Sequence, residues 1–297
     1  MCDTDDDLKR EFSAPDIEPT PGWTRREFVM SALASATGLA LATTPAWAQM
    51  ITTDAQGLTA GDVRISARDM ALPAYRAMPA TSSGFPVVLV VADIYSVNEH
   101  FKDVCRRLAK LGYMAIAPRL YERQGDVTKL TENAEIQDKI MSRVPDAQVM
   151  SDLDATVAWA AKNDGNIDKL GMTGFCWGGR KTWIYAAHNP ALKAGVAWYG
   201  RFIDKRTELV PKHPIDVVEQ LNAPVLGLYG GADPGIPVST VDEMRAALKK
   251  AGKPAEIIVY PDAPHAFNAD YRTSYRKEAA QDGWKRMLEW FRKYGVA

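Results

Sequence analysis

The chain has few residues of the kinds that build metal sites and disulfide scaffolds, with three cysteines and four histidines among its 297 residues. It has no zinc-type cysteine and histidine spacing, HExxH helix motif, P-loop or GxGxxG turn, so the sequence predicts no metal ion and no cofactor. A formal net charge of −1 argues against a nucleic acid or an anionic membrane surface as the partner. These absences disfavour the metalloenzyme, nucleotide-binding and nucleic-acid-binding classes.

The composition that remains is typical of a large folded protein, with 46% hydrophobic and 25% charged residues. We find no internal repeat, and no linker long enough to divide residues 49–297. The sequence therefore predicts a single domain over 49–297, acting as a monomer.

The first 48 residues have a different character. Residues 1–24 hold seven acidic residues and three prolines, a composition typical of disorder. Arg25 and Arg26 then precede an uncharged stretch over 28–48 that ends in A-W-A at Ala48, a pattern that resembles a twin-arginine signal with its cleavage site. Because serine, threonine, glycine and proline make this stretch only weakly apolar, a signal is favoured over a membrane anchor. We expect export by the twin-arginine machinery, cleavage after Ala48 and a periplasmic or secreted location.

From about residue 57 onward, strand patterns alternate with helix patterns, which is typical of an α/β fold with a mostly parallel sheet covered on both faces. The continuous apolar run PVVLVV over 86–91 predicts a central strand. Cys105 lies on the apolar face of the helix that follows and is expected in the core. The other predicted strands are 62–66, 74–78, 113–117, 169–173, 193–199, 224–229 and 255–260, and the other predicted helices are 146–161, 179–187, 239–251 and 274–294.

Gly174-Phe175-Cys176-Trp177-Gly178 resembles the G-x-nucleophile-x-G turn of α/β-hydrolases, with cysteine in place of the usual serine. Such a turn joins a strand to a helix so sharply that side chains two residues from the nucleophile would collide, hence the two glycines. A thiol at a helix N-terminus faces the positive end of the helix dipole, which favours the thiolate. A buried structural cysteine in a glycine-rich turn is the alternative that this match alone leaves open.

Candidate partners for Cys176 follow two later predicted strands. Asp233 follows the strand over 224–229 and His265 follows the strand over 255–260. Parallel sheets place catalytic groups on the loops at the carboxyl ends of their strands, and the order nucleophile, acid, base is that of α/β-hydrolases. Asp262 is a rival acid, but this order takes the acid from an earlier loop than the histidine. The remaining histidines, His100, His188 and His213, fit the order less well.

The motifs G-F-C-W-G-G, A-W-Y-G, G-G-A-D and P-H-A-F, at their observed spacing, resemble the dienelactone hydrolase (carboxymethylenebutenolidase) family from about residue 57 to the C-terminus. The resemblance implies an α/β-hydrolase fold, a small ester or lactone as substrate, and a triad of Cys176, His265 and Asp233. It also implies an oxyanion hole made by the backbone N–H groups of Trp177 and Ile94.

Two positions depart from the family pattern. The family usually has a glutamate in an E-I-F-G stretch that helps to deprotonate the thiol, whereas this chain has D-I-Y-S beginning at Asp93, one methylene shorter. Thiol activation and a capping or loop role both stay open for Asp93. The family arginine four residues past the histidine, which binds a substrate carboxylate, is replaced by Ala269, and Arg272 follows shortly after. The candidates for the substrate pocket are Tyr95, Tyr121, Arg123, Tyr199 and Phe267, whereas Trp198 is expected in the core.

The cysteine limits the reaction that we expect. A thiolate leaves a tetrahedral intermediate more easily than an ordinary alkoxide does, so attack on plain alkyl esters should mostly reverse. Enolate and phenolate groups leave readily, so the sequence predicts a hydrolase of lactones or activated carboxylic esters that works through a cysteine acyl-enzyme. A general exported esterase or thioesterase, and a non-catalytic binding protein of the same fold, are the alternatives.

Overall fold

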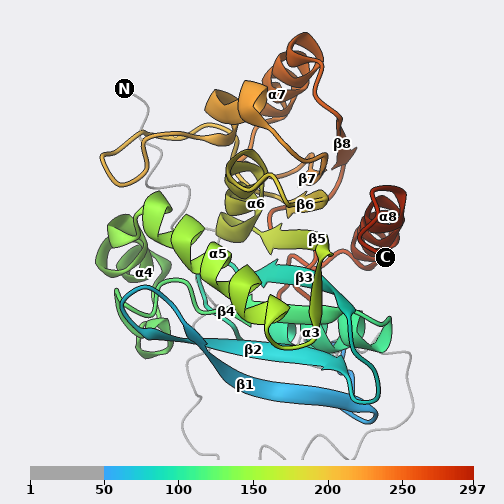
Figure 1. Cartoon of the computed structure of the whole chain (residues 1–297). Coiled ribbons are helices and arrows are strands. Elements are labelled where there is room, and N and C mark those ends of the chain that lie inside the picture. The colour runs from blue at the N-terminus through green and yellow to red at the C-terminus, as the bar shows by residue number, and fades with distance from the viewer. Residues whose placement is uncertain (1–49) are drawn as a thin grey trace, which may run out of the picture. The chain divides into compact units, whose positions relative to one another are not determined.

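Eight strands form one sheet in the order β1-β2-β4-β3-β5-β6-β7-β8 (Figure 1). The structure, a computed structural model, describes residues 50–297, so the predicted signal and its cleavage after Ala48 lie outside the described residues. The two first strands form an antiparallel hairpin whose second strand pairs antiparallel with β4, and every other pairing is parallel. The predicted mostly parallel sheet is thereby confirmed. The strands are β1 (Leu58–Ser66), β2 (Ala71–Pro79), β3 (Phe85–Val91), β4 (Met114–Pro118), β5 (Gly165–Phe175), β6 (Ala194–Trp198), β7 (Val225–Gly230) and β8 (Ala255–Tyr260).

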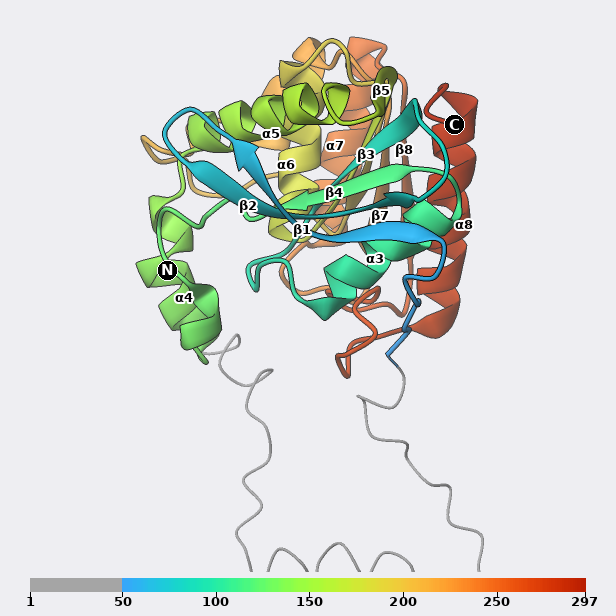
Figure 2. The same cartoon turned by 60° about the horizontal axis from the view of Figure 1, so that its bottom comes forward.

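Helices cover both faces of this sheet. Figure 2 shows α3 and α8 along one face, and α5 and α6 along the other. Because β3 is covered on both sides, its residues Val87–Val91 are all buried, which explains their continuous apolar run. The helices are α3 (Glu99–Lys110), α4 (Asn133–Lys139), α5 (Asp146–Ala161), α6 (Trp177–His188), α7 (Val238–Ala251) and α8 (Lys277–Lys293), with three short 3₁₀ turns at Val127–Lys129, Met141–Arg143 and Pro214–Gln220.

The core contains the two residues that the sequence analysis assigned to it. Cys105 is a free, fully buried cysteine on α3. Trp198 is fully buried at the end of β6, where its ring stacks on Phe175 with 5.5 Å between the ring centroids. Both predictions are confirmed.

Residues 50–56 are held on the folded domain before β1 begins. The backbone N–H of Ile51 donates to the Asp270 carboxylate at 2.7 Å, and the N–H of Thr53 donates to the Asp103 carboxylate at 2.5 Å. Asp103 lies on α3 and Asp270 follows β8. The segment over 50–56 is therefore hydrogen-bonded both to α3 and to the loop after β8. Within 50–297, no helix is long and apolar enough to cross a bilayer, and no group of three candidate ligands is placed to hold a metal ion.

Candidate active site

Cys176 lies between β5 and α6 in a strained backbone conformation, with φ of 55° and ψ of −113°. A Cβ atom at Gly174 would lie 2.1 Å from the carbonyl oxygen of Gly178. A Cβ atom at Gly178 would lie 2.2 Å from the carbonyl oxygen of Val91. Both contacts are with backbone atoms, which cannot move aside as a flexible side chain can. The turn therefore requires glycine at both positions. The same contact brings the start of α6 against the end of β3.

The loops after β7 and β8 bring an acid and a base to Cys176. His265 Nδ1 lies 2.6 Å from Asp233 Oδ2, and Asp233 Oδ1 accepts the N–H of Gly235 at 2.9 Å. Burial disfavours a charged imidazole, but the neighbouring Cys176 and the Asp233 carboxylate outweigh it and raise the pKa of His265 to about 10. At neutral pH the imidazole is therefore protonated, which stabilises a thiolate beside it.

Within residues 50–297, the carboxylate bonded to His265 is that of Asp233 and not that of the rival Asp262. The other three histidines have different neighbours. His100 bonds to Asp270 at 2.9 Å, His188 bonds to Asp154 at 2.7 Å, and His213 accepts from Arg180 at 3.2 Å.

The backbone N–H groups of Trp177 and Ile94, which are expected to bind an oxyanion, have no hydrogen-bond acceptor within residues 50–297. Trp177 is the first residue of α6, where helix N–H groups have no partner within the helix. Ile94 lies in the turn that follows β3. In the described part of the chain, neither N–H donates to a protein acceptor. Both donors are therefore available to a ligand.

The Asp93 carboxylate is buried in the same turn. One oxygen accepts the N–H of Tyr95 at 2.9 Å, and the other accepts from the Tyr271 hydroxyl at 3.3 Å and from Arg272 Nη2 at 3.5 Å. Burial raises the pKa of Asp93, although Arg272 opposes the shift. None of these bonds goes to the thiol of Cys176, so thiol activation by Asp93 stays a prediction.

Comparison with known proteins decides the family. The model of the dienelactone hydrolase family matches residues 72–295. The chain belongs to this family. A relative from Methylorubrum extorquens, named as a carboxymethylenebutenolidase, is 62% identical over 92% of this chain and 94% of its own length. The crystal structure of a dienelactone hydrolase from Klebsiella pneumoniae superimposes with a TM-score of 0.79 at 53% identity, over 80% of this chain and 99% of that one.

A more distant relative from a Bradyrhizobium species is named as a 2-oxo-3-(5-oxofuran-2-ylidene)propanoate lactonase. It is 33% identical over 74% of this chain and 88% of its own length. The predicted α/β-hydrolase fold and the predicted carboxylic ester hydrolase of the dienelactone hydrolase family are thereby confirmed.

Two aromatic residues line the His265 side of this dienelactone hydrolase site. The buried Tyr199 ring meets the His265 ring edge-on, with 5.1 Å between the ring centroids. Phe267 is fully buried and packs against Tyr199 at 5.3 Å, so it supports this wall from behind. The ring of Tyr95 lies under the Arg272 guanidinium, 4.4 Å from it, and its hydroxyl bonds to Asn133.

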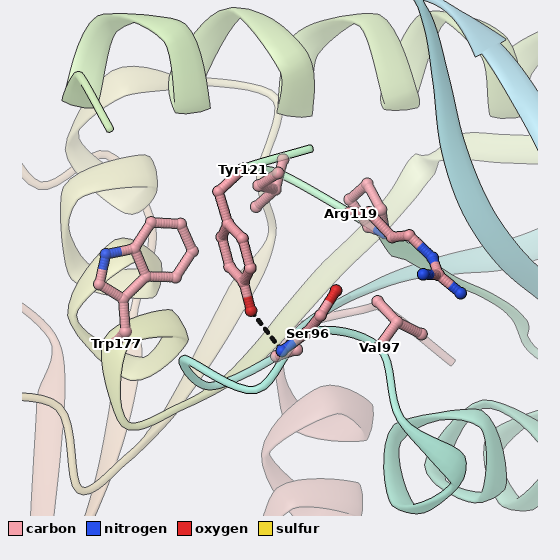
Figure 3. Close-up of a pocket in the computed structure, with 8 residues that line it drawn as sticks. Ser96, Val97, Arg119, Tyr121 and Trp177 are labelled. Carbon is pink, nitrogen blue, oxygen red and sulfur yellow. Dashed lines mark hydrogen bonds between the residues drawn. The ribbon is translucent and has the colours of Figure 1, made fainter. Parts of the chain in front are cut away.

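The other two pocket candidates have different surroundings. Arg123 is held by Asp69 at 2.9 Å and by Asp152 at 2.6 Å, so its guanidinium is not free to bind a substrate anion. Tyr121 is buried and lies edge-on to Trp177 (Figure 3). The small hollow that it lines does not include the triad, and its other lining residues are Ala92, Ser96, Val97, Pro118, Arg119, Leu120 and Trp177.

The sequence analysis missed a buried charge cluster beneath Trp177. Arg180 binds Asp146 through two hydrogen bonds of 2.8 and 2.7 Å, and Lys181 pairs with the same carboxylate. The Lys181 ammonium lies 4.4 Å from the centre of the Trp177 ring, a cation–π contact. Burial lowers the pKa of Lys181 to about 8, although Asp146 opposes the shift. The signal available in the sequence was the pair of adjacent cations, Arg180 and Lys181, in the predicted helix over 179–187.

Proposed function

We propose that the protein hydrolyses lactones and activated carboxylic esters through an acyl thioester on Cys176. The observation that carries the proposal is the hydrogen bond between Asp233 and His265, with a protonated His265 beside a cysteine on a strained strand-to-helix turn.

The first half of the reaction forms the thioester. The thiolate of Cys176 attacks the carbonyl carbon, and the carbonyl oxygen takes up the negative charge, facing the N–H groups of Ile94 and Trp177. When the bond to the leaving oxygen breaks, His265 gives that oxygen its proton. In a lactone the leaving group stays attached to the acyl chain, so the ring opens and nothing departs.

The second half releases the acid. His265, now neutral and oriented by Asp233, takes a proton from water while the water oxygen attacks the thioester carbonyl. The carbon–sulfur bond then breaks, the carboxylic acid leaves, and the thiolate of Cys176 and the protonated His265 are restored. No oxidant, reductant or metal takes part in this sequence.

The leaving group is the sharpest test of a cysteine nucleophile. We compare kcat/KM for phenyl acetate with kcat/KM for ethyl acetate. We expect this ratio to be about 100-fold or more larger than the ratio of the rates at which hydroxide hydrolyses the two esters, because the thiolate departs faster than an alkoxide. Steady-state rates give the ratio, and intact-mass spectrometry after rapid acid quench detects the acetyl group on the peptide that contains Cys176. Equal normalised rates for the two esters, with no adduct, would contradict the proposal.

We further propose that the preferred substrate carries a carboxylate, which binds Arg272. The guanidinium is partly exposed, and it lies 3.5 Å from Asp93 and 4.4 Å from the Tyr95 ring beside the nucleophile. The name of the Bradyrhizobium relative specifies a propanoate, which is such an anion. A substrate carboxylate that binds Arg272 competes with the Asp93 carboxylate for the positive guanidinium. Because the released Asp93 carboxylate is buried, it becomes a stronger base for the thiol.

Arg272→Gln tests this anion site. We expect KM for the phenyl monoester of succinate to rise about 10-fold, because the variant loses a charge-assisted hydrogen bond, and KM for the neutral phenyl acetate to stay within about twofold. Arg206→Gln is the control, since this exposed arginine pairs with Asp216 away from the triad. Equal changes for the two esters would argue against an anion site at Arg272.

Residues 1–48 fit export by the twin-arginine route, through Arg25 and Arg26 and the A-W-A tripeptide. We propose that the mature chain begins at Gln49 and acts outside the cytoplasm.

A further inference from the structure

A side chain bridges the turn over Asp93–Ser96. In an ordinary β-turn the C=O of the first residue accepts the N–H of the fourth. Here the Tyr121 hydroxyl binds both groups, because it donates to the Asp93 C=O at 2.7 Å and accepts from the Ser96 N–H. Figure 3 shows the bond from Ser96. The hydroxyl therefore links the first and the last residue of the turn.

The two other N–H groups of the turn belong to Tyr95 and Ile94, and they differ in whether they have an acceptor. The Tyr95 N–H donates to the Asp93 carboxylate at 2.9 Å. The Ile94 N–H has no acceptor within residues 50–297. Because the Asp93 C=O and the Ile94 N–H belong to one planar trans peptide, they point in opposite directions and turn together. A bond that fixes this carbonyl therefore also fixes the direction of the Ile94 N–H.

Tyr121 is itself held in place. Its side chain is only 3% exposed, and its ring meets the Trp177 ring edge-on with 5.5 Å between the centroids. Burial raises the pKa of Tyr121 well above its usual value, so the hydroxyl keeps the proton that it donates to Asp93. Ser96 has a φ of 64°, a conformation disfavoured for serine, so the turn depends on such contacts to persist.

We propose that Tyr121 is a positioning residue, whose hydroxyl fixes the Asp93–Ser96 turn and so directs the Ile94 N–H at the oxyanion of the tetrahedral intermediate. The inference rests on the acyl-transfer function proposed above. Without the hydroxyl, the Asp93 C=O loses the donor that fixes its direction. The shared peptide then rotates, and the Ile94 N–H turns away from the reacting oxygen.

Tyr121→Phe is the matched test, because the ring that packs on Trp177 remains and only the hydroxyl is lost. We expect kcat for phenyl acetate to fall by about 30- to 300-fold with KM within about threefold, the effect of losing one oxyanion donor. Alkylation of Cys176 by iodoacetamide should stay within about twofold of wild type, because displacement of iodide at a saturated carbon forms no oxyanion. A merely structural effect on the site would slow both reactions.

Tyr185→Phe is the control. This tyrosine is equally buried, and its hydroxyl also makes two hydrogen bonds, to Asp154 and from Asn189, near the far end of α6. It should retain wild-type kcat. Thermal unfolding of both variants shows whether the loss of a buried hydroxyl alone has changed the fold.

Two results would overturn the inference: a Tyr121→Phe variant with wild-type kcat, or one whose acylation and alkylation fall by the same factor. Cys176→Ala separates this inference from the function on which it rests. Full activity in Cys176→Ala would overturn the proposed function. An inactive Cys176→Ala beside a fully active Tyr121→Phe would overturn the role of Tyr121 alone.

Discussion

Cys176→Ala is expected to lower kcat/KM for phenyl acetate by about 10⁴-fold or more, because the variant has no atom that forms the acyl bond. The loss should appear in kcat, and the acetyl adduct should disappear from the mass spectrum. Thermal unfolding should change little, since Cys176 is only partly buried and alanine suits the space that the thiol leaves. His265 should become easier to deprotonate, because the neighbouring thiolate contributes to its raised pKa.

Cys105→Ala is the control for this experiment, as the second cysteine of the described chain. Its thiol is fully buried on α3, and burial raises its pKa, so it is chemically inert at neutral pH. We expect wild-type rates from this variant and a small loss of stability from the cavity. Residual activity above about 1% of wild type in Cys176→Ala would instead point to a different nucleophile.

Gly178→Ala is expected to lower the free energy of unfolding by about 3 kcal/mol or more, which corresponds to a drop in Tm of about 6–12 °C for a domain of this size. The added Cβ would lie 2.2 Å from the carbonyl oxygen of Val91 and 2.7 Å from that of Ala92. These contacts are relieved only if α6 moves away from β3. The same movement takes Cys176 away from His265 and Asp233. Calorimetry and circular dichroism measure the stability, and the esterase rate reports the displacement.

Gly61→Ala provides the comparison, because a Cβ on this residue of β1 meets no atom within 4 Å and its φ is not positive. We expect its free energy of unfolding to change by less than about 1 kcal/mol. If the two alanine variants proved equally stable, the close approach of α6 to β3 would not be what requires glycine at position 178.

The sheet was predictable because its strands have strong local patterns. The apolar run over 86–91 lies within β3, and the predicted helix over 146–161 has the bounds of α5. The segment between β4 and α5 was not assigned, since α4 and the short 3₁₀ turns there are too brief to produce a periodic pattern. These elements are held by tertiary contacts rather than by local preference.

The order of the triad residues along the chain was predictable from the motifs, because each follows a strand. The contacts around them were not. Asp93 meets Arg272, and Tyr121 meets Ser96, across parts of the chain that only the folded sheet brings together. A tyrosine hydroxyl that bridges a turn has no local signature, so the sequence did not predict these bonds of Tyr121. Lys181 beneath Trp177 was also not predicted, although the adjacent cations Arg180 and Lys181 were visible in the sequence.

The anchored segment over 50–56 has a consequence for the lifetime of the mature chain that we propose. If export removes residues 1–48, only Gln49 and Met50 precede Ile51, whose N–H is bonded to Asp270, and Thr53 is bonded to Asp103 soon after. A peptidase must draw the backbone into its own cleft, which requires that these bonds first break. We therefore expect that a mature chain beginning at Gln49, if the proposed cleavage occurs, is trimmed only slowly by an aminopeptidase.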